Sequence, residues 1–99
     1  MAKEVLMHAV VGRVAIDSGR ADEARELLDT FTIPTVKQQP GFVSGTWLRS
    51  ADGTSGTSVL LVESAEAATA LAARMAEGPP PEAPVKFVSA DVFEVVGKA

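Results

Sequence analysis

The sequence predicts an α+β domain whose elements follow the order strand, helix, strand, strand, helix, strand. The central observation is a β-hairpin between Pro40 and Ser64. Two runs rich in β-branched and aromatic residues, 42–50 and 57–62, flank a turn of glycines and short polar residues. One helix-type pattern precedes this hairpin and another follows it, and a strand-type segment lies towards each end of the chain. The hairpin is therefore the centre of a two-fold pseudo-repeat.

Composition limits both the class of protein and its partners. The 99 residues suffice for a single domain, 1–99, with one modest core, and 46% hydrophobic with 22% charged residues is typical of a globular chain. The net charge is −4, and the Lys and Arg residues are scattered, which disfavours nucleic acid and anionic membrane surfaces as partners. The chain has no cysteine, which excludes disulfides, thiolate metal sites and cysteine nucleophiles.

The start of the chain bears on its location. Met1 to Met7 lacks a basic region followed by a long apolar run, so we expect no signal peptide. No segment approaches about 18 uninterrupted apolar residues, the length needed to span a membrane. We therefore expect a cytoplasmic protein with no membrane partner.

The first half of the chain predicts a strand and then a helix. Residues 7–16 are apolar on both alternating faces, although a strand with one solvated face should alternate, so we expect both faces of the sheet to be covered. A helix is expected from about Arg20 to about Gln38, and Pro34 should kink or restart it. Its apolar stripe is predicted to consist of Ala24, Leu27, Leu28 and Phe31.

The second half predicts a helix and a final strand. Ser64 is a plausible N-cap for a helix over 65–77, in which Ala68, Leu71, Ala72 and Met75 form one stripe. A stiff extended proline connector follows over 78–84. Residues 85–96 form the last strand, and simple alternation places Val85, Phe87 and Phe93 on one face.

This order predicts a ferredoxin-like βαββαβ fold. Right-handed crossovers place two helices on one face of a four-stranded antiparallel sheet. The opposite face keeps much of its apolar character, and an uncovered face of this size exceeds the patch that is normal for a monomer. We therefore predict a homodimer formed through the sheet face. The alternative is a monomer whose exposed face binds a different partner.

Three short motifs carry a resemblance to a known family. They are Pro40-Gly41-Phe42, Trp47-Leu48-Arg49-Ser50, and Val62-Glu63-Ser64 followed by an alanine-rich helix. From about His8 to Val96 the chain resembles the antibiotic biosynthesis monooxygenase-like (ABM) domains of the dimeric α+β barrel superfamily. The resemblance implies a homodimer and, in each subunit, a pocket between helices and sheet. Members include cofactor-independent oxygenases of aromatic polyketides, haem-degrading oxygenases and proteins of no known activity.

The resemblance also limits which residues could act. Haem-degrading members use asparagine, tryptophan and histidine, and the polyketide oxygenases are thought to use asparagine, tryptophan and tyrosine. This chain contains no asparagine, no tyrosine and one histidine, so haem degradation by that set is disfavoured. His8 and Trp47 remain as catalytic candidates, and Arg13, Phe31 and Phe42 as substrate-binding candidates. No cofactor and no metal are expected, because one histidine and scattered carboxylates lack ligand spacing.

Each of these residues also has an ordinary structural interpretation. His8 is either a proton carrier near neutral pH or a half-buried strand residue. Trp47 is either a pocket wall or part of the core or dimer interface. Arg13 either anchors an anionic substrate or pairs with Asp91 or Glu94. Phe42 is most simply a core residue.

Two functions remain open from the sequence. The first is a small cofactor-independent, monooxygenase-like enzyme acting on an apolar aromatic substrate. The second is a non-catalytic, dimeric domain that binds a small ligand or acts as a scaffold. Polar groups converging in an open space between helices and sheet would favour the enzyme.

Overall fold

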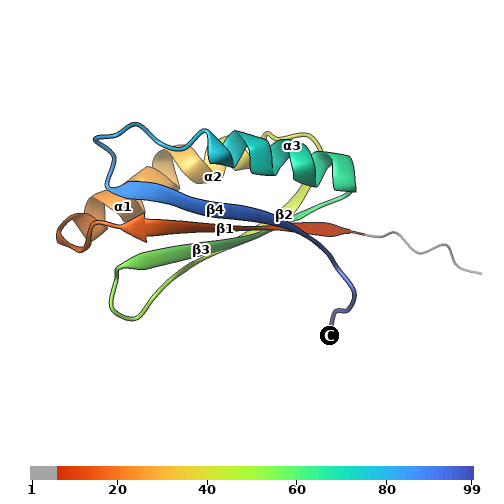
Figure 1. The fold of residues 1–99 in the computed structure, drawn as a ribbon, viewed down its shortest axis with the longest axis horizontal. Helices are drawn as coiled ribbons and strands as arrows, with labels where there is room; N and C mark the ends of the chain where they lie inside the picture. The colour runs from red at the N-terminus through yellow and green to blue at the C-terminus, as the bar shows by residue number, and fades with distance from the viewer. Residues whose placement is uncertain (1–6) are drawn as a thin grey trace, which may run out of the picture.

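The computed structural model describes residues 7–99, which form one antiparallel sheet with helices on one face only (Figure 1). The strands are β1 (His8–Ile16), β2 (Phe42–Arg49), β3 (Ser55–Val62) and β4 (Val85–Glu94), in the spatial order β2-β3-β1-β4. The predicted ferredoxin-like fold is thereby confirmed. The expected absence of a signal peptide concerns a segment that lies mostly outside the described residues.

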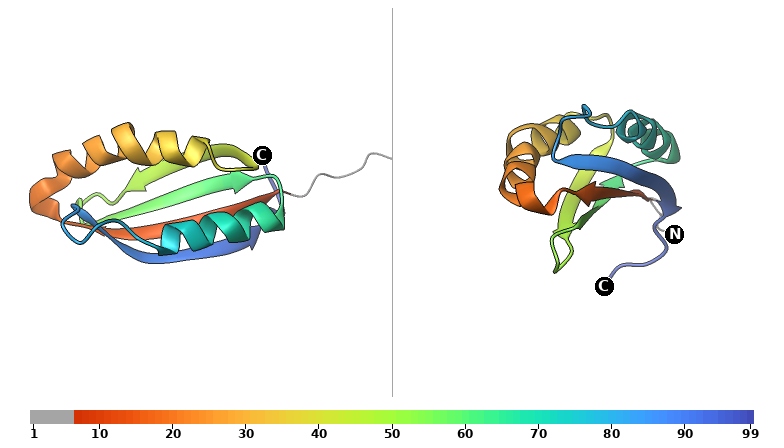
Figure 2. Two further views of the ribbon diagram at one scale, coloured as in Figure 1. Left: turned by 90° about the horizontal axis from the view of Figure 1, so that it is seen from above. Right: turned by 60° about the vertical axis from the view of Figure 1, so that its left-hand side comes forward.

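Two helical stretches run along the covered face of the sheet (Figure 2). The first comprises the 3-10 turn η1 (Ser18–Arg20), α1 (Ala21–Leu27), the π-helical turn η2 (Leu28–Thr32) and α2 (Ile33–Lys37). The second is α3 (Ala65–Ala76), which packs on β4 and β1. The first stretch touches the sheet chiefly where α2 meets β2.

The predicted disturbance at Pro34 is the π-helical turn that precedes it. Proline has no N–H to donate and its ring clashes with the carbonyl four residues earlier, so the helix widens before it and resumes at Ile33. The wider turn changes the angular position of the residues within it. Phe31 is consequently 62% exposed, and its predicted place on the buried stripe is wrong.

Helix α3 follows its sequence signals closely. The Ser64 hydroxyl caps the helix by accepting a hydrogen bond from the backbone N–H of Ala67 at 3.1 Å. Ala68 and Leu71 are buried, and Ala72 and Met75 pack beside them, which confirms the predicted stripe. Gly78, with a φ of +73°, lies just beyond the end of the helix.

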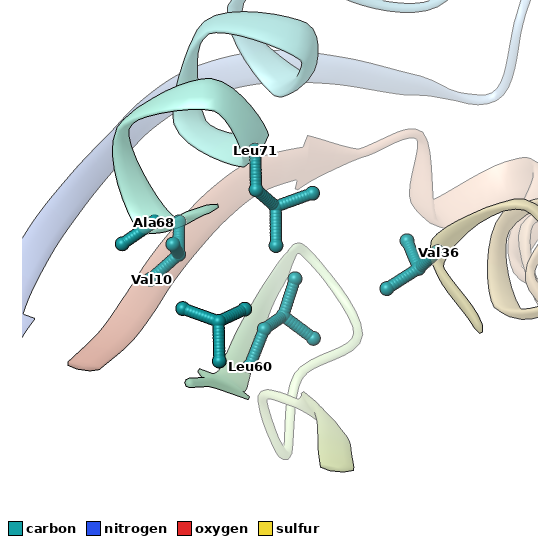
Figure 3. Packing of buried hydrophobic residues seen from close by; sticks show 6 residues of the cluster. Val10, Val36, Leu60, Ala68 and Leu71 are labelled. Atoms are coloured by element: carbon teal, nitrogen blue, oxygen red, sulfur yellow. The ribbon is translucent and has the colours of Figure 1, made fainter. Parts of the chain in front are cut away.

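The core lies between α3 and the covered face of the sheet. Figure 3 shows Leu71 of α3 and Val36 of α2 approaching the strand residues from different helices. The buried cluster consists of Val10, Val36, Leu60, Val62, Ala68 and Leu71. Val10, Val62 and Ala68 are completely inaccessible, so this end of α3 is the most tightly packed part of the fold.

The proline connector is bent and anchored. The backbone N–H of Ala83 donates to the carbonyl of Pro80 at 3.0 Å, which closes a turn, so the predicted extended path is wrong. Arg20 Nη1 donates to the carbonyl of Glu82 at 3.0 Å and thereby attaches the connector to the start of the first helical stretch.

Two β-bulges break the alternation that the sequence predicts. One lies in the β1–β4 ladder at Arg13/Val14, and the other in β2 between Phe42 and Ser44. Each extra residue reverses the faces of the residues beyond it. Phe87 therefore shares the covered face with Val14, whereas Phe93 pairs with Ala9 on the other face. Their predicted placement on one face is wrong.

Strand β1 pairs directly with β4, which places Arg13 beside the strand that carries Asp91 and Glu94. Arg13 lies opposite Ser89, two pairs away from Asp91. Even so, Arg13 forms no salt bridge within residues 7–99, where the ion pairs are Arg20–Glu23 and Arg25–Asp29. The expected pairing of Arg13 with Asp91 or Glu94 is therefore absent from the single chain.

One face of the sheet is uncovered by helices (Figure 1). Its residues follow from the register: Ala9, Val11 and Arg13 of β1; Thr46 and Leu48 of β2; Thr57, Val59 and Leu61 of β3; and Asp91 and Phe93 of β4. Leu48 and Phe93 are each more than half exposed. In the single chain, the expectation that both faces are covered is met on one face only.

Candidate functional site

The covered face has a floor of small residues at its centre. Gly12 of β1 pairs with Ser58 of β3, which pairs in turn with Trp47 of β2. Gly56 and Gly45 lie on the same face, two residues from Ser58 and Trp47 respectively. Small residues on three adjacent strands leave room above the sheet, and larger side chains reach into part of that room. We call the space between this floor and the helices the helix–sheet layer.

Two large side chains lie over the glycines of the floor. A Cβ atom on Gly12 would overlap the Cε methyl of Met75, and one on Gly45 would lie 2.8 Å from the Trp47 ring. Met75 therefore reaches down from α3, and the Trp47 ring lies along β2. Both pack against the buried core yet keep part of their surface exposed.

Ser58 is the polar group of this layer. Its side chain and backbone together are 8% exposed, and it is the one buried polar residue within residues 7–99. Its Oγ would lie 2.8 Å from a Cβ on Gly12, next to the Met75 methyl, so the hydroxyl projects towards the helices.

The first helical stretch closes the layer only loosely. Neither α1 nor η2 contains a buried residue, and Val36 is the single buried residue of α2. Leu27, Leu28 and Ile33 are only half-buried despite their apolar side chains. The side of the layer that faces α1 and η2 is therefore less tightly packed than the side beneath α3.

His8 lies at one end of the same face, away from Trp47. It pairs with Val62, which pairs with Phe42, whereas Trp47 belongs to the Gly12–Ser58 row. The two rows are four residues apart along β1, or about 13 Å at the usual rise per strand residue. The structure therefore does not bring the two catalytic candidates together. The His8 Nδ1 atom is enclosed and has no hydrogen-bond partner among residues 7–99.

The three substrate-binding candidates lie in three different places. Phe42 packs against the core at the His8 end of the layer. Phe31 is exposed on η2, and Arg13 is exposed on the uncovered face. Of the five candidates, His8, Phe42 and Trp47 share the covered face of the sheet.

Sequence reasoning did not single out Ser58 as a site residue. A lone serine in a strand has no motif, and its inward orientation depends on the register with β1. The available signal is the alternation of Gly56, Ser58, Leu60 and Val62, which places a polar residue in an otherwise apolar or small series. Met75 was predicted, but only as part of the core stripe.

Other kinds of site find little support in the described part of the chain. Residues 7–99 contain no group of three or more His, Asp or Glu side chains placed to hold a metal ion. No helix there is long and apolar enough to cross a membrane. A hollow of about 320 Å³ is lined by Gly78, Pro79, Val85 and Phe87 among others, and none of the five sequence candidates lines it.

The family follows from the sequence together with this fold. Residues 7–75 match the sequence model of the family described as antibiotic biosynthesis monooxygenase (ABM). The chain therefore belongs to this family, as its short motifs indicated. No curated protein matches the chain.

Two solved structures share the fold. The haem-degrader MhuD of Mycobacterium tuberculosis, solved with two haems in its active site, has a TM-score of 0.71 and 24% identity, covering 93% of this chain and 98% of MhuD. The ActVA-Orf6 monooxygenase of Streptomyces coelicolor, in complex with nanaomycin D, has a TM-score of 0.58 and 22% identity, covering 96% and 91%. At these identities the likeness establishes a monooxygenase-like fold.

Proposed function

We propose that the chain is a small cofactor-independent oxygenase that acts on an apolar aromatic substrate in the helix–sheet layer. The observation that carries this proposal is the partly exposed Trp47 side chain, whose ring lies over Gly45 in the floor of small residues, beneath a loosely packed helical stretch. Membership of the monooxygenase family and the ring-containing ligands of both structural neighbours support it.

The chemistry assigns separate tasks to the His8 end of the layer and to its centre at Trp47. Such a substrate must lose a proton before it gives electrons to oxygen, and an unprotonated imidazole nitrogen accepts a proton. His8 is half-buried and its Nδ1 has no hydrogen-bond partner within residues 7–99, so in the tautomer protonated at Nε2 this nitrogen can accept the proton once the ring turns towards the substrate. Trp47 supplies an apolar wall that excludes water. We assign His8 as the proton acceptor and Trp47 as a substrate-binding wall.

Oxidation of anthrone to anthraquinone tests this function. The methylene carbon loses two hydrogens and gains one oxygen atom from O2, and the second oxygen atom leaves as water with those hydrogens. The substrate therefore supplies all four electrons. We expect O2 uptake and anthraquinone formation in equal amounts, above the spontaneous rate. His8→Ala should lower the enzymatic rate by about 100-fold, in keeping with loss of a general base.

Variants at His8 and at Trp47 separate loss of catalysis from loss of substrate binding. Trp47→Phe should raise KM more than it lowers kcat, because it alters a wall and leaves the base in place. Phe31→Ala is the matched control, since this exposed aromatic side chain lies outside the layer. If His8→Ala and Trp47→Phe both left turnover intact, the assignment would be wrong.

A second function is favoured by one specific observation. The layer brings a single buried polar residue, Ser58, beside Trp47, while His8 lies in a row four residues away along β1. A domain that binds an aromatic ligand without transforming it needs no base next to that ligand. Binding without O2 uptake would therefore identify a non-catalytic ligand-binding domain.

The oligomeric state belongs to the same proposal. We propose a homodimer in which the uncovered sheet faces of two chains pack together. The apolar residues Val11, Val59 and Leu61 are adjacent in the register of this face, and Leu48 and Phe93 extend the patch on the outer strands. A second copy would bury this apolar surface, which is unfavourable in water.

A further inference from the structure

We infer that the Ser58 hydroxyl is the polar anchor that orients an oxygen-bearing aromatic ligand, a fused-ring phenol or ketone, beside Trp47. This inference rests on the proposed function and adds to it a specificity-determining residue. The geometry that carries it is a buried hydroxyl at the centre of an apolar floor, aimed at the helices.

The position of Ser58 is fixed by pairing on both sides. Gly12 lies next to it on β1 and Trp47 on β2, and directly opposed strand residues point to the same face. The 2.8 Å approach of its Oγ to a Cβ on Gly12 places the hydroxyl on the covered face. Because Trp47 and Ser58 are directly opposed on this face, a ligand that lies across this pair can contact both side chains.

The hydroxyl has no partner within residues 7–99. The side-chain hydroxyls that do form hydrogen bonds there are those of Thr30, Ser50, Thr54 and Ser64. His8 Nδ1 is the one fully enclosed, unpaired side-chain atom of these residues, so the Ser58 oxygen keeps some accessible surface. An accessible hydroxyl with no protein partner among these residues is free to donate to or accept from a ligand oxygen.

The surroundings define the chemical class of the ligand. Trp47, Leu60 and Met75 present apolar surface around a single hydroxyl, which both donates and accepts a hydrogen bond. An aromatic ring carrying one oxygen matches this arrangement. Met75 has an unbranched thioether side chain that adopts many rotamers, so it can move from Gly12 to admit a ring.

The test uses the fact that Trp47 is the only tryptophan. Its indole N–H gives a single cross-peak in a 15N-labelled sample, and this cross-peak is followed while naphthalene or 1-naphthol is added. We expect the preference for 1-naphthol over naphthalene to fall by about three- to ten-fold in Ser58→Ala, the range for loss of one hydrogen bond. Naphthalene affinity and the thermal midpoint should not fall, because the alanine removes an unpaired hydroxyl.

Ser55→Ala is the matched control, because Ser55 is an exposed serine on the same strand with its side chain on the other face. It should leave the preference unchanged. If both compounds bind but Ser58→Ala keeps the preference, the inference is overturned and the proposed site stands. If Ser58→Ala unfolds several degrees earlier and weakens both compounds equally, the hydroxyl is structural and the inference is overturned. If neither compound moves the wild-type cross-peak, the proposed function fails as well.

Discussion

Residue size decides how the covered face of the sheet is filled. A Cβ on Gly45 would lie within 2.9 Å of both the Trp47 ring and the Leu60 side chain, so a larger residue there would displace the ring. Gly12 admits the Met75 methyl in the same way. The two glycines thus shape the layer as directly as the aromatic residue does, and their importance is visible only once the strands are paired.

Asp52 holds the hairpin turn through its carboxylate. Its Oδ1 accepts hydrogen bonds from the hydroxyls of Ser50 and Thr54, both at 2.7 Å, and from the Thr54 N–H at 3.0 Å. These bonds, that from Ser50 first, lower the Asp52 pKa from 3.8 to about 2. The folded-state pKa is depressed, so the carboxylate contributes stability above pH 3.8, and this contribution is lost as the pH falls towards 2.

We predict that the Asp52 carboxyl carbon titrates near pH 2 in a 13C NMR experiment. Asp52→Ala should lower the thermal midpoint at pH 7 and make little difference near pH 2. Thr54→Val is the matched variant, because it removes one hydroxyl donor and keeps the backbone N–H. It should move the Asp52 pKa back towards 3.8. A titration near pH 4 in the wild type would contradict this description of the turn.

At the scale of elements, the sequence predicted where the helices and strands lie. It did not predict on which face of the sheet every strand residue lies. Ser64 at the start of α3 and Gly78 after its end are local signals, since capping and left-handed glycines act within one turn. The bulges in β2 and β4 have no such signal. They depend on which strand lies alongside, so simple alternation misplaced Phe93 relative to Phe87.

The dependence on strand pairing also explains which parts of the candidate site could be predicted from the sequence. Trp47 and His8 are each unique in the chain and were identified from the sequence. Their separation by four residues of β1 follows from the pairing of three strands. Arg49 and Glu63 illustrate the point, because both belong to the hairpin region yet the register does not place them opposite each other. Arg49 instead pairs with Gly56 near the turn, and Glu63 lies beyond the other end of β3.

At the scale of the whole molecule, the apolar uncovered face is the basis of the proposed homodimer. We predict that light scattering at micromolar concentration gives twice the chain mass of 10.3 kDa. Val59→Asp should shift the protein towards the single-chain mass, because it places a charge at the centre of the apolar patch. The single chain should still fold, since this side chain faces solvent there.

Phe31→Asp is the control for this change, because Phe31 is exposed on the helical side of the molecule. It introduces the same charge and should leave the dimer intact. A wild-type protein that elutes and scatters as a single chain at micromolar concentration would rule out the homodimer. It would favour the alternative in which the face binds a different partner.

The central claim is that a small aromatic molecule binds between the helices and the sheet. Mapping the chemical-shift changes caused by naphthalene across all backbone amides and methionine methyls tests it most directly. We predict that the changes centre on Trp47, Ser58 and the Met75 methyl. Changes centred instead on Leu48, Val59 and Phe93 would place the ligand on the uncovered face and contradict the claim.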